Sequence, residues 1–275
     1  MATLIVGLGF MGGSLAAALT AAGEEVLLYH RRSEVTRAAA DRGWGKALDE
    51  LGDMQAERAV VCTPVSVIAA QVAVVAAAQP EAVITDVSST KAQLCKDLGE
   101  LARDGRFVGS HPMCGSHLQG LEHAHDDLYR GATVALTPAA GAPSAAIATI
   151  TELWRSVGAH CVTMPPETHD EAVAYASHLP HVLASLAAGL ADTDTALRLA
   201  ASGFRDTTRV AAGSPALWCD ILTENRAAIL RALDRSTAAL SELRAALEAG
   251  DEAAIKAWLK QGQQVRQTFE RRTTE

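Results

Sequence analysis

The first 165 residues alternate short runs of apolar, β-branched residues with longer segments rich in alanine and leucine, such as residues 15–22 and 67–78. This alternation predicts strand–helix–strand units that form a mostly parallel sheet with helices on both faces. The chain is therefore expected to have an α/β fold. The expected strands are residues 4–6, 26–29, 59–62, 83–86, 107–109, 133–136 and 160–162.

The pattern changes after residues 165–166, where two prolines follow each other, and only helices are expected beyond them. Apolar residues then recur at helical spacing, for example at Ile255, Trp258 and Leu259. A helical segment with several apolar stripes needs a surface that covers them, so we expect a homodimer built on the C-terminal helices. The expected helices are residues 168–191, 196–201, 215–249 with a possible break, and 251–271.

Composition narrows the class of protein. Hydrophobic residues make up 49% of the chain but aromatic residues only 4%, and alanine, which favours helices, accounts for much of the difference. The net charge of −8 and the absence of basic runs argue against a nucleic-acid partner. The longest apolar run, residues 72–78, is far shorter than the ~20 residues of a membrane span. Five scattered cysteines and an N-terminus without a basic region predict a cytoplasmic protein with reduced thiols.

A glycine-rich turn follows the first expected strand and opens an alanine-rich helix. Its glycines allow a tight turn, a close approach of the backbone to a pyrophosphate, and close packing of helix on strand. The free N–H groups of the helix then face the phosphates. This motif predicts a Rossmann dinucleotide-binding domain. Its expected cofactor-binding residues are Gly7, Gly9, Phe10, Met11 and Gly12, joined by Thr63 after the strand at 59–62.

The end of the second strand indicates which dinucleotide is bound. Sites for NAD usually carry an acidic residue there, which would repel the 2′-phosphate of NADP. This chain has His30, Arg31, Arg32 and Ser33 instead, and the two arginines can neutralise a phosphate with charge-assisted hydrogen bonds. We therefore expect NADP in preference to NAD.

Four further segments decide the interpretation. They are Asp-Val-Ser-Ser-Thr-Lys at 86–91, Gly-Ser-His-Pro-Met-Cys-Gly at 109–115, Ser-His-Leu-Pro-His at 177–181, and Gly-Phe-Arg-Asp-Thr-Thr-Arg-Val-Ala at 203–211. In order and spacing they resemble the prephenate/arogenate (cyclohexadienyl) dehydrogenase family of tyrosine biosynthesis. The resemblance covers nearly the whole chain. It implies a Rossmann domain over residues 1–165 and an all-helical substrate and dimerisation domain over residues 166–275.

The resemblance also implies a reaction and a set of roles. The reaction is an oxidative decarboxylation, in which a ring alcohol loses a hydride and a proton while CO2 departs. His111 matches the family's catalytic histidine and Ser89 the serine that hydrogen-bonds to it and to the substrate hydroxyl. Arg209 matches the arginine that holds the ring carboxylate. The positions near the substrate side chain are His178, His181 and Ser177.

Four residues depart from the family's common pattern: Ser88, Thr90, Cys114 and His117. Ser88 is expected to crowd the nicotinamide end and His117 to alter charge at the mouth of the pocket. Cys114 is interpreted as a small packing residue, since hydride chemistry needs no thiol nucleophile. None of the four removes a catalytic group.

Other candidate residues receive structural interpretations. The spacing of His117, His123 and His125 fits no familiar set of metal ligands, so no metal site is expected. The tryptophans at 154, 218 and 258 lie at apolar helical positions, which indicates core or dimer packing. Arg205 is expected to pair within its loop, for instance with Asp206.

Two other functions remain open at this point. One is a different NADP-dependent reductase with a Rossmann domain and a helical dimer domain, acting on imines or β-hydroxy acids. The other is a non-catalytic NADP-binding sensor. Within the tyrosine pathway, the stretches around the second strand resemble the NADP-linked arogenate branch, while prephenate stays open as a substrate.

Overall fold

A parallel five-stranded sheet forms the first layer of the fold. The structure is a computed structural model that describes residues 1–115 and 118–274. The strand order is β3-β2-β1-β4-β5 and every pair is parallel. The strands are β1 (Ala2–Val6), β2 (Glu25–Tyr29), β3 (Lys46–Ala47), β4 (Arg58–Val61) and β5 (Val83–Asp86). All but β3 lie where the apolar runs predict them.

Helices cover both faces of this sheet, as the pattern predicts. One core contains Ile5 and Leu28 with side chains of helices α1 and α6, and the other contains Leu4 and Leu27 with side chains of α3. Successive strand residues point to opposite faces, so the two clusters are the two sides of one sheet. The helices of this region are α1 (Phe10–Ala21), α2 (Ser33–Asp41), α3 (Val65–Ala78), α4 (Ala92–Asp97), α5 (Gly99–Arg103) and α6 (Ser144–Ser156).

The remaining strands form a second sheet of three, and this corrects the expectation of one mostly parallel sheet. The order is β6 (Gly109–Pro112), β7 (Thr133–Thr137) and β8 (His160–Thr163), with β6 antiparallel to β7. An antiparallel pair needs no helical crossover, and the described part of the β6–β7 connection contains only the short 3-10 helix η1 (Leu121–His123). The strand expected at 107–109 is shifted, because Phe107 makes only an isolated bridge to Ile84.

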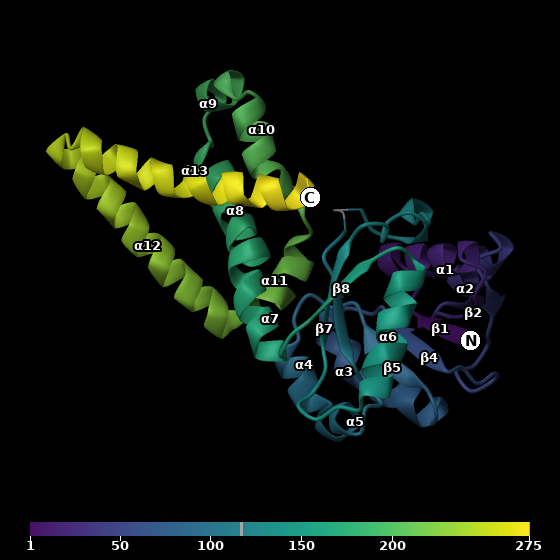
Figure 1. Ribbon diagram of the computed structural model, residues 1–275. Helices are drawn as coiled ribbons and strands as arrows, with labels where there is room; N and C mark the ends of the chain where they lie inside the picture. Colours follow the sequence, from purple (N-terminus) through teal and green to yellow (C-terminus); the bar gives the residue numbers. More distant parts are fainter. Residues whose placement is uncertain (116–117, 275) are drawn as a thin grey trace. The chain divides into compact units, whose positions relative to one another are not determined.

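Helices alone follow β8 in the part of the chain that the structure describes. α7 (Pro166–Val173), the π-helical turn η2 (Ala174–His178) and α8 (Leu179–Leu190) form the continuous helical run predicted from the sequence (Figure 1). The π turn lies just before Pro180, which lacks a backbone N–H and interrupts the regular α-helical hydrogen bonds. The run is followed by α9 (Asp194–Leu199), α10 (Ser202–Thr208), the 3-10 helix η3 (Arg209–Ala212) and α11 (Pro215–Glu224).

The chain divides into two compact units, residues 1–226 and 227–275. The second contains almost all of α12 (Arg226–Ala249) and all of α13 (Glu252–Thr274). These helices pack on each other, since the indole N–H of Trp258 donates to the carbonyl of Ala239 at 3.0 Å. No helix in the described ranges is both long and apolar enough to cross a membrane. The domain boundary expected after residue 165 stays a prediction.

Candidate functional site

The glycine-rich turn has the shape that a bound dinucleotide requires. Gly7 has a positive φ of 96°, and a Cβ on Gly12 would lie 1.9 Å from the carbonyl oxygen of Gly7. A Cβ on Gly9 would meet no atom within 4 Å, so the space above the N-terminus of α1 is open. In the part of the chain that the structure describes, no side chain caps this terminus. Its backbone N–H groups therefore remain available for a phosphate.

Side chains around this turn fit a dinucleotide as well. The hydroxyl of Thr63 is buried and has no hydrogen-bond partner within the described ranges, and a polar group of a ligand would supply one. Phe10 is buried and its ring lies 5.8 Å from that of His125. The carbonyl of Met11 accepts a hydrogen bond of 2.8 Å from the hydroxyl of Tyr129. Phe10 and Met11 thus hold the turn in place through packing and the backbone, and any direct contact of these two with a cofactor stays a prediction.

The residues after β2 present positive charge at the surface. Arg31, Arg32 and Ser33 are exposed. The Arg32 guanidinium lies 3.8 Å from the Glu34 carboxylate, while the Ser33 hydroxyl accepts a hydrogen bond of 3.0 Å from Arg37. Arg37 is thus a third cation at this edge, which the sequence motif did not indicate.

His30 is fixed by its own turn. Its Nδ1 accepts a hydrogen bond of 3.0 Å from the backbone N–H of Arg32. Burial and, next, the Arg32 charge lower the pKa of His30 below its ordinary value, so the ring is neutral near pH 7.

His111, the predicted catalytic histidine, belongs to a buried chain of polar groups. It lies on β6, and its Nδ1 is 2.9 Å from Nε2 of His169 on α7. The Nδ1 of His169 in turn lies 2.7 Å from Oδ1 of Asp170. Burial above all, and then the charge of Lys91, hold the pKa of His111 well below its ordinary value. A neutral imidazole is the form that accepts a proton.

The loop after β5 carries a buried ion pair next to this chain. The Lys91 ammonium contacts the carboxylate of Asp86 and the hydroxyl of Ser88, and both charged side chains are fully buried. Ser88 also donates to Asp86 at 2.5 Å. Ser88 is therefore part of the support of the loop, whereas its expected crowding of the nicotinamide stays a prediction. Ser89 is half-buried in the same loop, and within the described residues no hydrogen bond joins it to His111.

Two further sequence departures have structural partners. The hydroxyl of Thr90 lies 3.5 Å from Oε2 of Glu224. Cys114 packs on the core that contains α1, and burial raises the pKa of its thiol to about 11. Its interpretation as a packing residue is confirmed. His117 lies outside the described residues.

Two histidines and a tryptophan lie together at the positions predicted to bind the side chain of the substrate. The rings of His181 and Trp218 are stacked with centroids 3.5 Å apart, and His178 lies edge-on to Trp218. Nδ1 of His178 is 3.2 Å from the amide nitrogen of Asn225. An amide nitrogen donates, so His178 carries its proton on Nε2. That atom and Nδ1 of His181 are buried, and neither has a hydrogen-bond partner among the described residues.

The other predicted substrate-binding residues lie near this cluster in the fold. Ser177 is half-buried and directly precedes His178. Arg209 is exposed at the first position of η3, and η3 packs against α8, which carries His181. The structure records no contact between the described side chains of Arg209 and His111. Arg205 pairs with Asp206 at 3.3 Å, as predicted.

Sequence reasoning missed four residues of this region: His169, Asp170, Asn225 and Trp218. The His-Asp pair at 169–170 stands in the first helix after the double proline, and its position at a domain junction was the one available signal. Trp218 was assigned to core or dimer packing, and the structure corrects this, because its ring covers His181. The sequence around Trp218 does not distinguish a tryptophan that stacks on a histidine from one that packs in a core.

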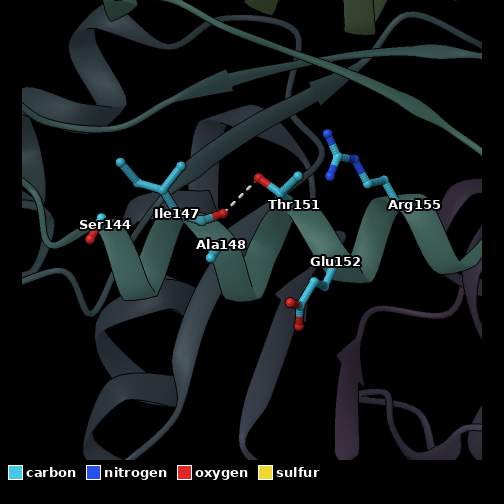
Figure 2. A pocket seen from close by; sticks show the side chains of 6 residues that line it. All are labelled: Ser144, Ile147, Ala148, Thr151, Glu152 and Arg155. Carbon is cyan, nitrogen blue, oxygen red and sulfur yellow. Dashed lines mark hydrogen bonds between the residues drawn. The ribbon is translucent and has the colours of Figure 1, made fainter.

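Two other features of the described residues lack the composition of a functional site. His125 pairs with Asp127 at 2.5 Å and His123 lies 4.0 Å from Glu122, and no group of three metal-ligating side chains occurs among the residues described. A hollow of about 300 Å³ lies on the outer face of α6 (Figure 2). Its lining comes from this single helix and contains none of the predicted site residues. The lining residues are Ser144, Ile147, Ala148, Thr151, Glu152 and Arg155.

The fold and the glycine turn define a Rossmann-type dinucleotide-binding protein with an added helical region. Comparison with known families matches residues 15–163 to the nucleotide-binding domain of prephenate dehydrogenase and residues 165–261 to its dimerization domain. The chain belongs to the prephenate dehydrogenase family. The predicted family and the predicted class of enzyme, an oxidoreductase, are therefore confirmed.

Individual relatives cover nearly the whole chain. A cyclohexadienyl dehydrogenase of Zymomonas mobilis is 34% identical, over 95% of this chain and 94% of its own length. A prephenate dehydrogenase of Bacillus subtilis is 33% identical, over 90% of this chain and 70% of its own. The solved Synechocystis arogenate dehydrogenase superposes with a TM-score of 0.87 at 29% identity, covering 98% of this chain and all of that one.

Proposed function

We propose that this enzyme catalyses the oxidative decarboxylation of arogenate or prephenate, with hydride transfer to NADP. The observation that carries the proposal is the buried, neutral His111, which His169 holds in place. The open glycine turn and the cluster of His178 and His181 belong to the same compact unit. The names of the relatives support the same substrates, since they include arogenate, prephenate and cyclohexadienyl dehydrogenases.

In the proposed reaction the chain supplies a base, a cation and hydrogen-bonding groups. His111 accepts the proton of the substrate hydroxyl, with Ser89 hydrogen-bonded to the same oxygen. Arg209 binds the ring carboxylate until the carbon–carboxylate bond breaks, its electron pair enters the ring and CO2 departs. His178, through its Nε2–H, and His181 with Ser177 receive the side chain of the substrate. A nicotinamide dinucleotide bound at the glycine turn supplies the hydride acceptor.

The preference for NADP rests on the charge after β2. Arg31 is exposed, whereas the guanidinium of Arg32 lies near Glu34. Arg31 should therefore contribute more to binding of a 2′-phosphate than Arg32. Substituting Arg31→Ala is expected to raise the KM for NADP roughly tenfold and to leave that for NAD unchanged. A solved relative, the prephenate dehydrogenase of Aquifex aeolicus, is described with NAD+. An Arg31→Ala variant with an unchanged KM for NADP would contradict the assignment.

The direct test is absorbance at the reduced-nicotinamide band in four parallel reactions, which combine NADP or NAD with arogenate or prephenate. Growth of the signal in one reaction identifies substrate and cofactor together. No signal in any reaction, with NADP binding retained, would refute the proposed reaction.

A homodimer in the cytoplasm is also proposed. The matched dimerization domain ends at residue 261, and Leu240, Leu247, Leu259 and Val265 are exposed on the two C-terminal helices. All five cysteines are free, which suits a reducing compartment. Light scattering of the purified protein measures the mass of the particle, and a monomer at micromolar concentration would contradict the dimer.

A further inference from the structure

The hydrogen bonds around His111 determine where its protons lie. Asp170 accepts backbone N–H groups from Lys91 and Ala92, both at 2.9 Å, in addition to the ring of His169. Each oxygen of this side chain accepts from a backbone N–H group, so both act as acceptors, and the Nδ1 of His169 carries the proton of its hydrogen bond to Oδ1.

The same reasoning continues to the next ring. When Nδ1 is the nitrogen of His169 that carries the proton, its Nε2 is bare and can only accept. Its neighbour at 2.9 Å, Nδ1 of His111, must therefore donate. The remaining ring nitrogen of His111, Nε2, is then bare and has a lone pair ready for a proton. The chain of hydrogen bonds thus selects one tautomer of the proposed base.

We propose that His169 and Asp170 are a positioning pair that holds His111 as the Nδ1–H tautomer and shares the positive charge formed when Nε2 takes a proton. This inference rests on the proposed function, because it assigns the source of basicity of the same histidine. His169 contacts His111 and no reacting atom, so its role is to orient and to stabilise.

Proton movement in this arrangement is balanced. The substrate O–H bond breaks, its electron pair stays on oxygen, and the proton forms a bond to Nε2 of His111. The Nδ1–H proton of His111 can then shift toward Nε2 of His169. The Nδ1–H of His169 stays hydrogen-bonded to the Asp170 carboxylate. The new positive charge therefore lies between two rings and next to an anion, in a buried site where such interactions are strong. When the electron pair of the departing CO2 enters the ring, the ring oxygen becomes a phenolate, and reversal of these shifts returns the proton to that oxygen.

Other charges face His111 and act against this stabilisation. Burial lowers the pKa of His111 most, followed by the charge of Lys91, which is paired with Asp86, and by charge on the rings of His169 and His178. A base in such surroundings would be weak without an acceptor on its far side. The Asp170–His169 chain supplies that acceptor, and it also explains why two buried polar residues occupy the first helix after β8.

The tautomer is tested in the protein without substrate. Nitrogen-15 imidazole spectra of the whole protein, with the signal of His111 assigned from a His111→Asn sample, report which ring nitrogen is protonated. The expected result near pH 8 is a protonated Nδ1 and a bare Nε2, and in His169→Leu a mixture of both tautomers. A wild-type His111 protonated on Nε2, or an unchanged tautomer in His169→Leu, would overturn the proposal.

Kinetics test the role in turnover. His169→Leu is expected to lower kcat about 100-fold with the KM of substrate and cofactor within about twofold. His169→Gln should recover part of the loss, because its carboxamide oxygen accepts the Nδ1–H but cannot carry the charge. Asp170→Asn should reduce kcat by a smaller factor when it is added to His169→Leu than when it is made alone, since the two residues act on His111 as one unit. The control is Glu167→Gln, which changes an exposed carboxylate on the same helix.

The pH profile separates positioning from a general structural effect. Loss of the acceptor destabilises protonated His111, so the acid limb of kcat should move to lower pH in His169→Leu. A purely structural role would lower kcat evenly at every pH, and that result, or a kcat within threefold of wild type, would contradict the proposal. If the wild-type enzyme turns over neither substrate, the proposed function fails, and the nitrogen spectra still decide the tautomer.

Discussion

Replacement of Lys91 by Met is a sharp test of how the site is held together. Lys91 is fully buried, and its ammonium contacts the carboxylate of Asp86 and the hydroxyl of Ser88. Met has a similar length and no charge. The substitution therefore leaves the buried Asp86 carboxylate without its cation. Its remaining donors among the described residues are the N–H groups of Ser88 and Ser110, at 2.9 and 3.0 Å, and the Ser88 hydroxyl.

The expected cost follows from the burial of both partners. Removing one member of a buried ion pair typically destabilises a protein by about 3–5 kcal/mol, because the remaining charge is left uncompensated. In a unit of this size that loss lowers Tm by on the order of 10 °C. Substituting Asp86→Asn together with Lys91→Met should cost less than Lys91→Met alone, since no unpaired charge remains.

Urea unfolding followed by circular dichroism measures this loss, and Lys96→Met, at an exposed position of α4, is the matched control. Activity gives a second readout. The charge of Lys91 lowers the pKa of His111, so Lys91→Met should raise that pKa and move the acid limb of kcat to higher pH. A free-energy loss below about 1 kcal/mol, or a double variant worse than Lys91→Met, would refute the reasoning.

Three further outcomes are expected. His111→Asn should lower turnover by roughly two to four orders of magnitude with dinucleotide binding intact in a fluorescence titration, and near-normal turnover would exclude this base. Gly9→Ala should fold normally but bind the dinucleotide more weakly. Gly12→Ala should also lose stability, because its Cβ would meet a carbonyl oxygen at 1.9 Å. Equal melting temperatures of the Gly9→Ala and Gly12→Ala variants would contradict this. Burial lowers the pKa of His178 from 6.5 to about 4. As pH falls, this histidine is therefore protonated in the unfolded chain before it is protonated in the folded one, and the free energy of unfolding should drop by roughly 3 kcal/mol between pH 6.5 and 4. Urea titrations at several pH values should show a smaller drop in the His178→Gln variant. An unchanged dependence of the unfolding free energy on pH would contradict the assignment of the drop to His178.

Elements with a strong local pattern could be predicted from the sequence, and elements defined by pairing could not. β1, β2, β4 and β5 are apolar runs, so their positions follow from hydrophobicity alone. β3 is an exposed pair of residues that is a strand only because Leu27 and Leu28 pair with it. The antiparallel direction of β6 likewise depends on where the chain returns, which no local pattern encodes.

The same distinction holds at the site. His111 was found because a motif surrounds it, and Arg205 and Asp206 because they are neighbours in the sequence. The partner of His111, His169, is 58 positions away, and Asn225 reaches His178 across 47. The first contact exists only after α7 has packed against β6, and the second only after the helices that follow β8 have packed on one another, so residue types and spacings could not reveal them.

The charges in the described part of the site limit how a substrate can be recognised there. Lys91 and Asp86 compensate each other, and Asp170 is bound by N–H donors. His111 and His178 are kept neutral by burial, which lowers the pKa of each. A carboxylate-bearing substrate therefore meets hydrogen-bond donors but no uncompensated buried cation in these groups. Attraction of its charge must come from an exposed group at the edge, and Arg209 on η3 has both the chemistry and the exposure for that role.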